Sequence, residues 1–132
     1  MAQYVDGFLL PIPRNRLSDY QRVAEKVADV WKEYGALEYC ENVGDDLNRE
    51  GTLAFTNVVD ANKDEVIIFG WVVFESKQAR DLANKKVAAD PRMVELIEPL
   101  IEPENPVFDA GRMAYGGFRT LVQSSKVKLN KE

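Results

Sequence analysis

Asp6 is the residue best placed to do chemistry, because it is a carboxylate in the middle of an otherwise apolar, strand-like segment at residues 4–12. A carboxylate that is buried, ionised and unpaired is strongly unfavourable, so Asp6 must be exposed, paired or protonated. One interpretation makes it a general base or a hydrogen-bond acceptor for a ligand. The other makes it a structural partner of Arg112, of Arg119 or of a backbone amide, and we expect this second role, with Arg112 as the partner. Replacing Asp6 with asparagine should then destabilise the fold, because the arginine would lose its counter-ion.

Trp71, Arg112 and Tyr115 are the residues that could join Asp6 around a small-molecule cavity. Aromatic side chains with a polar tip are common in ligand pockets, although they also occur in cores and interfaces. We therefore take Asp6, Trp71, Arg112 and Tyr115 as candidate substrate-binding residues, and no catalytic residue is assigned. A cavity of ~300 Å³ or more with Asp6 facing into it would favour ligand binding, whereas a filled interior would favour a non-catalytic module.

The sequence contains no histidine and a single cysteine, Cys40. Histidine is the commonest general base, metal ligand and haem ligand, so mechanisms that depend on imidazole are excluded. One cysteine can form neither a disulfide within the chain nor a cysteine-based zinc site. We therefore expect no metal and no cofactor, and we expect the Cys40 thiol, with Glu38 and Glu41 nearby, to be unreactive.

Length and composition are those of one globular domain covering residues 1–132. Hydrophobic residues make up 45% and charged residues 30%, and no apolar stretch approaches the ~20 residues of a membrane helix. The net charge of -5 lacks the basic surplus that phosphate backbones attract, so no nucleic-acid partner is expected. The first residues include no basic leader and place Asp6 where a signal peptide would be apolar, which predicts a cytoplasmic protein.

Residues 66–74 predict a strand whose two faces are both hydrophobic. Helices of the same chain can cover one of these faces. The rest of a 132-residue chain is too short to build a second layer, so a second copy of the chain is the simplest cover for the other face. The sequence therefore predicts a homodimer in which two sheets pack against each other.

The remaining elements follow from hydrophobic periodicity and from capping residues. Apolar residues at three- and four-residue spacing predict a helix over residues 17–34, with a capping box at Ser18 and a left-handed end at Gly35. Ser76 is expected to cap a second helix, and Asp90 with Pro91 a short third one. Strands are expected at residues 4–12, 37–43, 66–74 and 113–122, with an edge strand within 53–59 and a solvated tail at 124–132.

The expected order is strand, helix, strand, strand, helix, strand. This order is that of a ferredoxin-like α+β fold, in which a four-stranded antiparallel sheet carries both helices on one face. The fold class follows from the order of the elements alone. It does not depend on the identity of the candidate site residues.

Several groups of residues also carry a resemblance to a known family. They are Tyr4-Val-Asp-Gly-Phe8, Tyr34-Gly-Ala-Leu37, the block from Phe69-Gly-Trp71 through residues 76–84 to Asp90-Pro-Arg-Met93, and Phe108-Asp109 with Arg112-Met-Ala-Tyr-Gly-Gly-Phe118. In this order they resemble DUF1428, a family of small bacterial proteins. The resemblance implies a dimeric α/β barrel, in which two ferredoxin-like protomers pack sheet to sheet. It implies no activity, because the function of the family is unknown.

Two functions of different classes remain open from the sequence. The first is a small-molecule-binding protein, or a monooxygenase-like enzyme that needs no cofactor, and it rests on fold analogy. The second is a non-catalytic homodimer that acts as an interaction or stress-related module. We favour the first, because Asp6 and Arg112 are difficult to place without a polar cavity.

Overall fold

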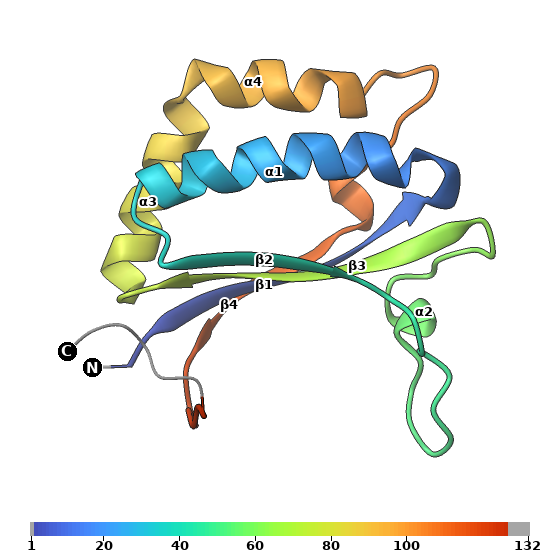
Figure 1. Ribbon diagram of the computed structural model, residues 1–132, viewed down its shortest axis with the longest axis horizontal. Helices are drawn as coiled ribbons and strands as arrows, with labels where there is room; N and C mark the ends of the chain where they lie inside the picture. Colours follow the sequence, from blue (N-terminus) through green and yellow to red (C-terminus); the bar gives the residue numbers. More distant parts are fainter. Residues whose placement is uncertain (1, 127–132) are drawn as a thin grey trace.

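The computed structural model describes residues 2–126 and contains a four-stranded antiparallel sheet with the strand order β2-β3-β1-β4 (Figure 1). The strands are β1 (Tyr4–Pro13), β2 (Glu38–Val43), β3 (Glu65–Phe74) and β4 (Ala114–Arg119). The helices are α1 (Leu17–Glu33), α2 (Phe55–Val58), α3 (Lys77–Ala89) and α4 (Pro91–Ile97). Helices α1, α3 and α4 lie on one side of the sheet, and α2 lies on the other. The predicted ferredoxin-like α+β fold is confirmed.

Helix α1 follows a 3-10 turn at Arg14–Arg16 and stops before Gly35, whose φ is +117°. Glycine adopts this left-handed region without steric strain, which explains why the helix ends there as predicted. The predicted capping box at Ser18 is wrong, because Arg16 occupies the N-cap position and Ser18 lies inside the first turn. Asp19, in the same turn, instead accepts a hydrogen bond from Arg16 Nε at 2.6 Å.

The starts of α3 and α4 are set by side-chain caps, as predicted. Ser76 Oγ accepts a hydrogen bond from the backbone N–H three residues later at 3.1 Å. Asp90 Oδ1 accepts one from the Arg92 backbone N–H at 2.8 Å, and Pro91 holds the first helical position. The Arg92 guanidinium and the Tyr34 hydroxyl also bind the Asp90 carboxylate and hold its pKa far below its usual range.

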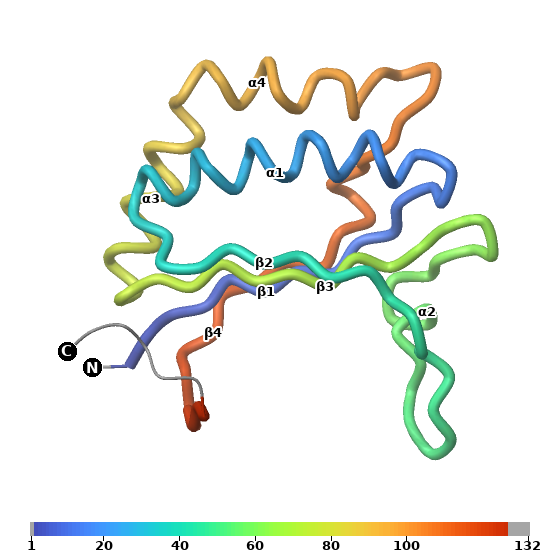
Figure 2. The backbone as a smooth tube through the Cα atoms, in the orientation of Figure 1, coloured from blue at the N-terminus to red at the C-terminus, as the bar shows by residue number. Residues whose placement is uncertain are grey.

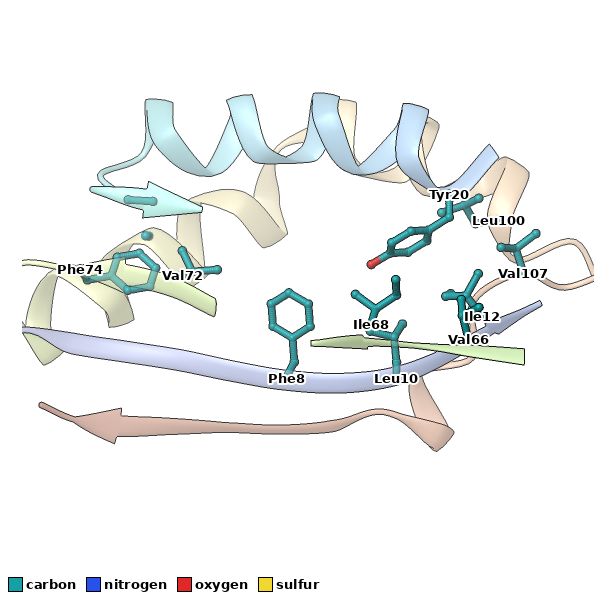
Figure 3. Packing of buried hydrophobic residues seen from close by; sticks show 12 residues of the cluster. Phe8, Leu10, Ile12, Tyr20, Val66, Ile68, Val72, Phe74, Leu100 and Val107 are labelled. Atoms are coloured by element: carbon teal, nitrogen blue, oxygen red, sulfur yellow. The ribbon is translucent and has the colours of Figure 1, made fainter. Parts of the chain in front are cut away.

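The core lies between the sheet and the helices (Figure 3). Alternate side chains of β1 point toward the helices, so Phe8, Leu10 and Ile12 are buried there. Their partners on β3 face the same way, since Phe8 lies opposite Gly70 and Leu10 opposite Ile68. The buried cluster consists of Phe8, Leu10, Ile12, Tyr20, Ala36, Val66, Ile68, Val72, Phe74, Ala83, Leu100 and Val107.

The other face of the sheet, which we call the open face, is also apolar. Strand alternation directs Leu9 of β1, Phe69 and Trp71 of β3 and Phe118 of β4 away from α1 and α3. Phe69 is 44% exposed and Phe118 is 61% exposed. Strand β3 therefore has two apolar faces, as expected, and α1 and α3 cover one of them.

Residues 44–64 connect β2 to β3 and extend past one end of the sheet, as the backbone trace shows (Figure 2). The predicted edge strand within residues 53–59 is wrong, because this segment contains the one-turn helix α2. Phe55, Val58 and Val59 are spaced by three and four residues, which suits a helix and not the alternation of a strand. Phe55 also stacks on Phe69 of the open face, with ring centroids 6.1 Å apart.

Strand β4 is shorter than the 113–122 expected from the sequence, because its pairing with β1 ends where Arg119 lies opposite Tyr4. Beyond it, the Thr120 backbone N–H donates to the Gln3 carbonyl at 3.0 Å. Of the predicted solvated tail, residues 124–126 are exposed. Residues 127–132 lie outside the described part of the chain.

Candidate functional site

A cavity of about 210 Å³ lies between the helix-covered face of the sheet and helices α1 and α4. Figure 3 shows Phe8 rising from β1 and Tyr20 descending from α1, with the Tyr20 hydroxyl directed toward the interior. Most of the wall is hydrophobic. The apolar part includes Val23, Val27 and Trp31 of α1, Met93 and Ile97 of α4, and Val72 of β3.

A polar cluster of Tyr20, Tyr39 and Glu41 forms one side of the cavity. The Tyr39 hydroxyl donates to Glu41 Oε2 at 2.6 Å, and the Tyr20 hydroxyl donates to Glu41 Oε1. Burial, and then the negative charge of Glu41, raise the pKa of both tyrosines well above its usual value. Both hydroxyls therefore stay protonated at physiological pH and remain donors to the carboxylate. This cluster presents a negative charge to an otherwise apolar cavity.

The floor of the cavity depends on a close approach between Phe8 and Gly70. These residues are neighbours across β1 and β3, and an added Cβ on Gly70 would come within 2.7 Å of Phe8 Cε2. The ring of Phe8 therefore lies in the space that a side chain on Gly70 would fill. On its other side Phe8 stacks with Tyr115 of β4, with ring centroids 6.1 Å apart.

Asp6 lies next to the cavity and is fully buried. Its Oδ2 accepts a hydrogen bond from the Tyr115 hydroxyl at 2.9 Å, and its Oδ1 lies 3.3 Å from Nη1 of Arg80. Burial raises the pKa of Asp6, and this effect outweighs the opposing effects of Tyr115 and Arg80. Arg80 comes from α3 and also contacts Tyr4, whose ring centroid is 4.8 Å from the guanidinium carbon.

Arg112 is not the partner of Asp6, so that prediction is wrong. Arg112 instead binds Glu65, at 2.7 Å from Nη1 to Oε2. Strand β4 does lie beside β1 as expected, but Gly117 is the residue opposite Asp6. Arg112 precedes Gly117 by five residues, which corresponds to about 16 Å of extended chain. Arg119, the other arginine considered, is exposed and lies opposite Tyr4.

Trp71 lies on the open face, so it does not line the cavity. Val72 is the residue opposite Asp6, and the two-residue period of a strand turns Trp71 the other way. Trp71 Nε1 donates to Glu38 Oε2 at 3.2 Å, and its ring meets Phe69 edge-on with centroids 5.4 Å apart. Of the four candidate residues, only Tyr115 therefore lines the cavity, and Asp6 lies behind it.

Glu41 and Arg80 are the important residues that sequence reasoning missed. A signal for Glu41 existed, because strand alternation places it on the same face as Leu37, Tyr39 and Val43, which is the apolar side of this strand. An inward-facing carboxylate on that side is the same anomaly that drew attention to Asp6. Arg80 offered no comparable signal, since its contact with Asp6 depends on how α3 is rotated over the sheet.

A second hollow, of about 400 Å³, runs between α1 and β2 on the outer side of the polar cluster. It shares Tyr20, Ala24, Tyr39 and Glu41 with the cavity. The polar cluster therefore stands between the inner cavity and the outer hollow. A molecule passing from one to the other would meet Glu41.

The described residues contain neither a metal-binding group nor a membrane-spanning helix. Between residues 2 and 126, no three histidine, cysteine, aspartate or glutamate side chains gather as a metal-binding group would require. None of the helices in that range is both long and apolar enough to cross a membrane. Cys40 is a free, partly buried thiol on the open face of β2.

The family whose description reads "Protein of unknown function (DUF1428)" matches residues 3–109, which is most of the chain. The chain belongs to the DUF1428 family. Among the relatives of this DUF1428 protein is the uncharacterized protein YbaA of Escherichia coli K12, which is 37% identical over 120 residues. The matched region covers 91% of this chain and 97% of YbaA. YbaA of Shigella flexneri matches to the same extent. The resemblance identified from the sequence is therefore confirmed, and it assigns no activity.

Solved structures with the same fold are more distant in sequence. A NIPSNAP family protein of unknown function from Agrobacterium tumefaciens has a TM-score of 0.55 and 14% identity, covering 92% of this chain and 91% of its own. A dimeric ferredoxin-like protein from an uncultured marine organism has a TM-score of 0.52 and 10% identity, covering 95% and 99%. At these identities the likeness supports the fold of this DUF1428 protein and nothing about its function.

Proposed function

We propose that the protein binds a small, largely apolar molecule in the cavity between the sheet and helices α1 and α4. The observation that carries this proposal is a half-open pocket with apolar walls and one polar side, since such a combination is typical of ligand pockets. At about 210 Å³ the pocket is smaller than the ~300 Å³ that would favour binding by size, and Asp6 does not line it, so the proposal rests on the composition of the wall. The ligand would be small, on the scale of one ring with a short chain.

The same cavity weighs against the alternative, a non-catalytic interaction module. A protein whose apolar surfaces serve assembly alone has no need for an apolar pocket with a positioned carboxylate on the helix-covered side of its sheet. The tyrosine hydroxyls of the polar cluster are aimed at Glu41, and Tyr115 is aimed at Asp6. Both carboxylates are thus held in defined positions at or beside the cavity.

A monooxygenase-like reaction without a cofactor is the catalytic form of this proposal. Such chemistry begins with removal of a proton from the substrate by a positioned base. Glu41 lines the cavity, and Asp6 can be reached from it through the Tyr115 hydroxyl. Oxygen uptake that depends on an added cavity ligand and is lost in Glu41→Gln would support this form. Ligand binding without oxygen uptake would contradict the catalytic form and leave the binding proposal standing.

We also propose that the protein works as a homodimer whose protomers meet through the open face, with the cytoplasm as its compartment. Exposed Phe69 and Phe118 lie on that face, and a large exposed apolar patch marks an interaction surface. The distant ferredoxin-like relative that is described as dimeric is consistent with this arrangement. The helix-covered cavity would stay accessible, because it lies on the opposite side of the sheet.

The binding proposal is tested by native mass spectrometry of the purified protein and by titration with small aromatic probes. Trp31 lines the cavity and Trp71 does not, so the Trp71→Phe variant gives a fluorescence signal from the cavity alone. Val27→Phe should fill the cavity and abolish binding, whereas Lys26→Phe, at the exposed neighbouring position, should bind normally. The proposal fails if no molecule is retained and no probe binds, or if Val27→Phe binds as well as the parent.

A further inference from the structure

We propose that the cavity selects an organic cation, a small alkyl or aryl amine in its ammonium form, and this inference rests on the proposed binding function. Its basis is the composition of the cavity wall, which combines six aromatic rings with one carboxylate and, among the described residues, no lysine or arginine. The rings belong to Phe8, Tyr20, Trp31, Tyr39, Phe108 and Tyr115.

The aromatic rings favour a positive charge over a neutral group of the same size. The face of an aromatic ring is electronegative and attracts a cation within about 6 Å of its centroid. In a cavity of about 210 Å³, any bound molecule lies close to several of these rings. Several such contacts together should favour a cation over its neutral analogue by roughly tenfold or more.

Glu41 has unused capacity to accept hydrogen bonds. A carboxylate accepts about four, and each oxygen of Glu41 receives one, from Tyr20 or Tyr39. No lysine or arginine between residues 2 and 126 pairs with it, although most other carboxylates held by side chains here do have such a partner. A partly buried carboxylate without a counter-ion is unfavourable, and an ammonium ligand would supply that counter-ion. The two tyrosines hold the Glu41 carboxylate in position for the ammonium group.

The same charges disfavour an anionic ligand. Glu41 would repel a carboxylate at short range, and Asp6 lies behind Tyr115 on the other side of Phe8. Arg80 cannot compensate, because it is engaged by Asp6 and Asp81 and does not line the cavity. A neutral alcohol could donate one hydrogen bond to Glu41 but would gain no ionic attraction. The expected order of affinity is therefore ammonium, then alcohol, then carboxylate.

Three probes with the same ring and a short chain test this order, namely 2-phenylethylamine, 2-phenylethanol and 3-phenylpropionate. Calorimetric titration of the full chain near neutral pH should give at least tenfold tighter binding of the amine than of the alcohol, and no measurable binding of the carboxylate. Equal or tighter binding of the alcohol overturns the cation inference and leaves the binding proposal standing. Absence of binding by all three overturns the inference, and the retained-molecule measurement then decides the binding proposal separately.

Glu41→Gln isolates the contribution of the charge. Glutamine has nearly the same shape and its carbonyl can still accept from a tyrosine, so amine affinity should fall at least tenfold while alcohol affinity changes little. Glu38→Gln is the matched control, because Glu38 lies on the same strand but on the open face. Should Glu41→Gln fail to fold, Phe108→Leu removes a ring and keeps the carboxylate. It should reduce the amine preference severalfold, and an unchanged preference in the folded variants overturns the inference.

Discussion

Oδ1 of Asp6 and Nη1 of Arg80 lie 3.3 Å apart, but the two side chains are not equally buried. The Asp6 side chain is fully buried, whereas the Arg80 side chain is 17% exposed. Asp6 Oδ1 accepts no well-aligned hydrogen bond from any described residue. The Asp6 carboxylate therefore receives only weak stabilisation from Arg80, and the Arg80 side chain retains partial access to water.

This asymmetry predicts that Arg80→Met costs more stability than Asp6→Asn. Without Asp6, Arg80 can turn toward solvent and Tyr115 can still donate to the asparagine carbonyl, so the loss should stay within about 1 kcal/mol. Without Arg80, a fully buried carboxylate loses its counter-ion, which costs on the order of 3 kcal/mol. Urea denaturation measures both. The sequence alone predicted a large loss for Asp6→Asn, and the partial exposure of Arg80 changes that expectation.

The double variant Asp6→Asn/Arg80→Met provides the coupling control. It should recover part of the loss seen in Arg80→Met, because the unpaired carboxylate is gone. Combining Asp6→Asn with Arg112→Met should instead give additive effects, since Arg112 pairs with Glu65. Coupling to Arg112 and none to Arg80 would contradict the structure.

Stability should depend on pH through Asp6. Burial raises its folded-state pKa above the ordinary value of 3.8, so the folded protein binds this proton more tightly than the unfolded chain does. The resulting stabilisation is complete below the unfolded pKa and is lost as the pH rises through the folded pKa. The unfolding free energy of the parent minus that of Asp6→Asn should therefore be larger at about pH 4 than at about pH 7. A difference that grows with pH would show that the pKa of Asp6 is lowered in the fold.

Gly70→Ala should close the cavity from below. The new methyl group would overlap the Phe8 ring and would also come within 2.9 Å of the Cys40 carbonyl oxygen of β2. It should push the ring toward the cavity and cost about 1–3 kcal/mol. Probe binding should be lost together with this stability. Gly116→Ala is the control, because the nearest side-chain atom to its added Cβ is 3.9 Å away, on the open face. Thermal unfolding and probe titration would check both, and normal binding by Gly70→Ala would contradict the placement of Phe8.

Trp31→Ala should destabilise the protein by about 3 kcal/mol, the lower end for a large aromatic residue. Trp31 packs against the core and meets Phe74 edge-on with centroids 6.2 Å apart, but it is only partly buried. Lys32→Ala, at the next and exposed position, should change the unfolding free energy by less than about 0.5 kcal/mol. A melting temperature unchanged by Trp31→Ala would mean that α1 presents another face to the sheet.

Sedimentation at micromolar concentration should show a dimer with an interface larger than ~1,200 Å² in total. Trp71→Glu or Phe118→Glu would place a charge on the open face and should give a folded monomer. Leu82→Glu is the control, since Leu82 is 53% exposed on α3, on the other side of the sheet. A parent protein that sediments only as a monomer would remove the dimer proposal and leave the cavity proposal untouched.

Local rules account for the parts of the fold that the sequence predicted. The end of α1 at Gly35, the cap at Ser76 and the start of α4 at Asp90 each depend on residues a few positions apart. The strand order follows from the sequence of elements, because few topologies join them without crossing. The wrong prediction at residues 53–59 is also local, since a helical spacing was read as a strand.

The site was harder to predict because its contacts join distant parts of the chain. The partner of Asp6 depends on the rotation of α3, which brings Arg80 and not Arg112 to the middle of β1. The exclusion of Trp71 could have been predicted, because an assignment of strand register places Val72, and not Trp71, opposite Asp6. The cavity itself depends on how far α1 stands from the sheet, which no local pattern reveals.

The strand order has a consequence for how the chain is made. Of the four strands, β1 leaves the ribosome first, yet its two neighbours in the sheet are β3 and β4, and β4 ends at Arg119. Its edge facing β3 can pair only after Phe74 has been synthesised, and its edge facing β4 only after Arg119. Pairing between segments this far apart slows folding, because a long loop must close before any contact compensates for the lost entropy. Nascent chains should thus expose the hydrophobic strand β1. Chaperones that recognise extended apolar segments should bind it there.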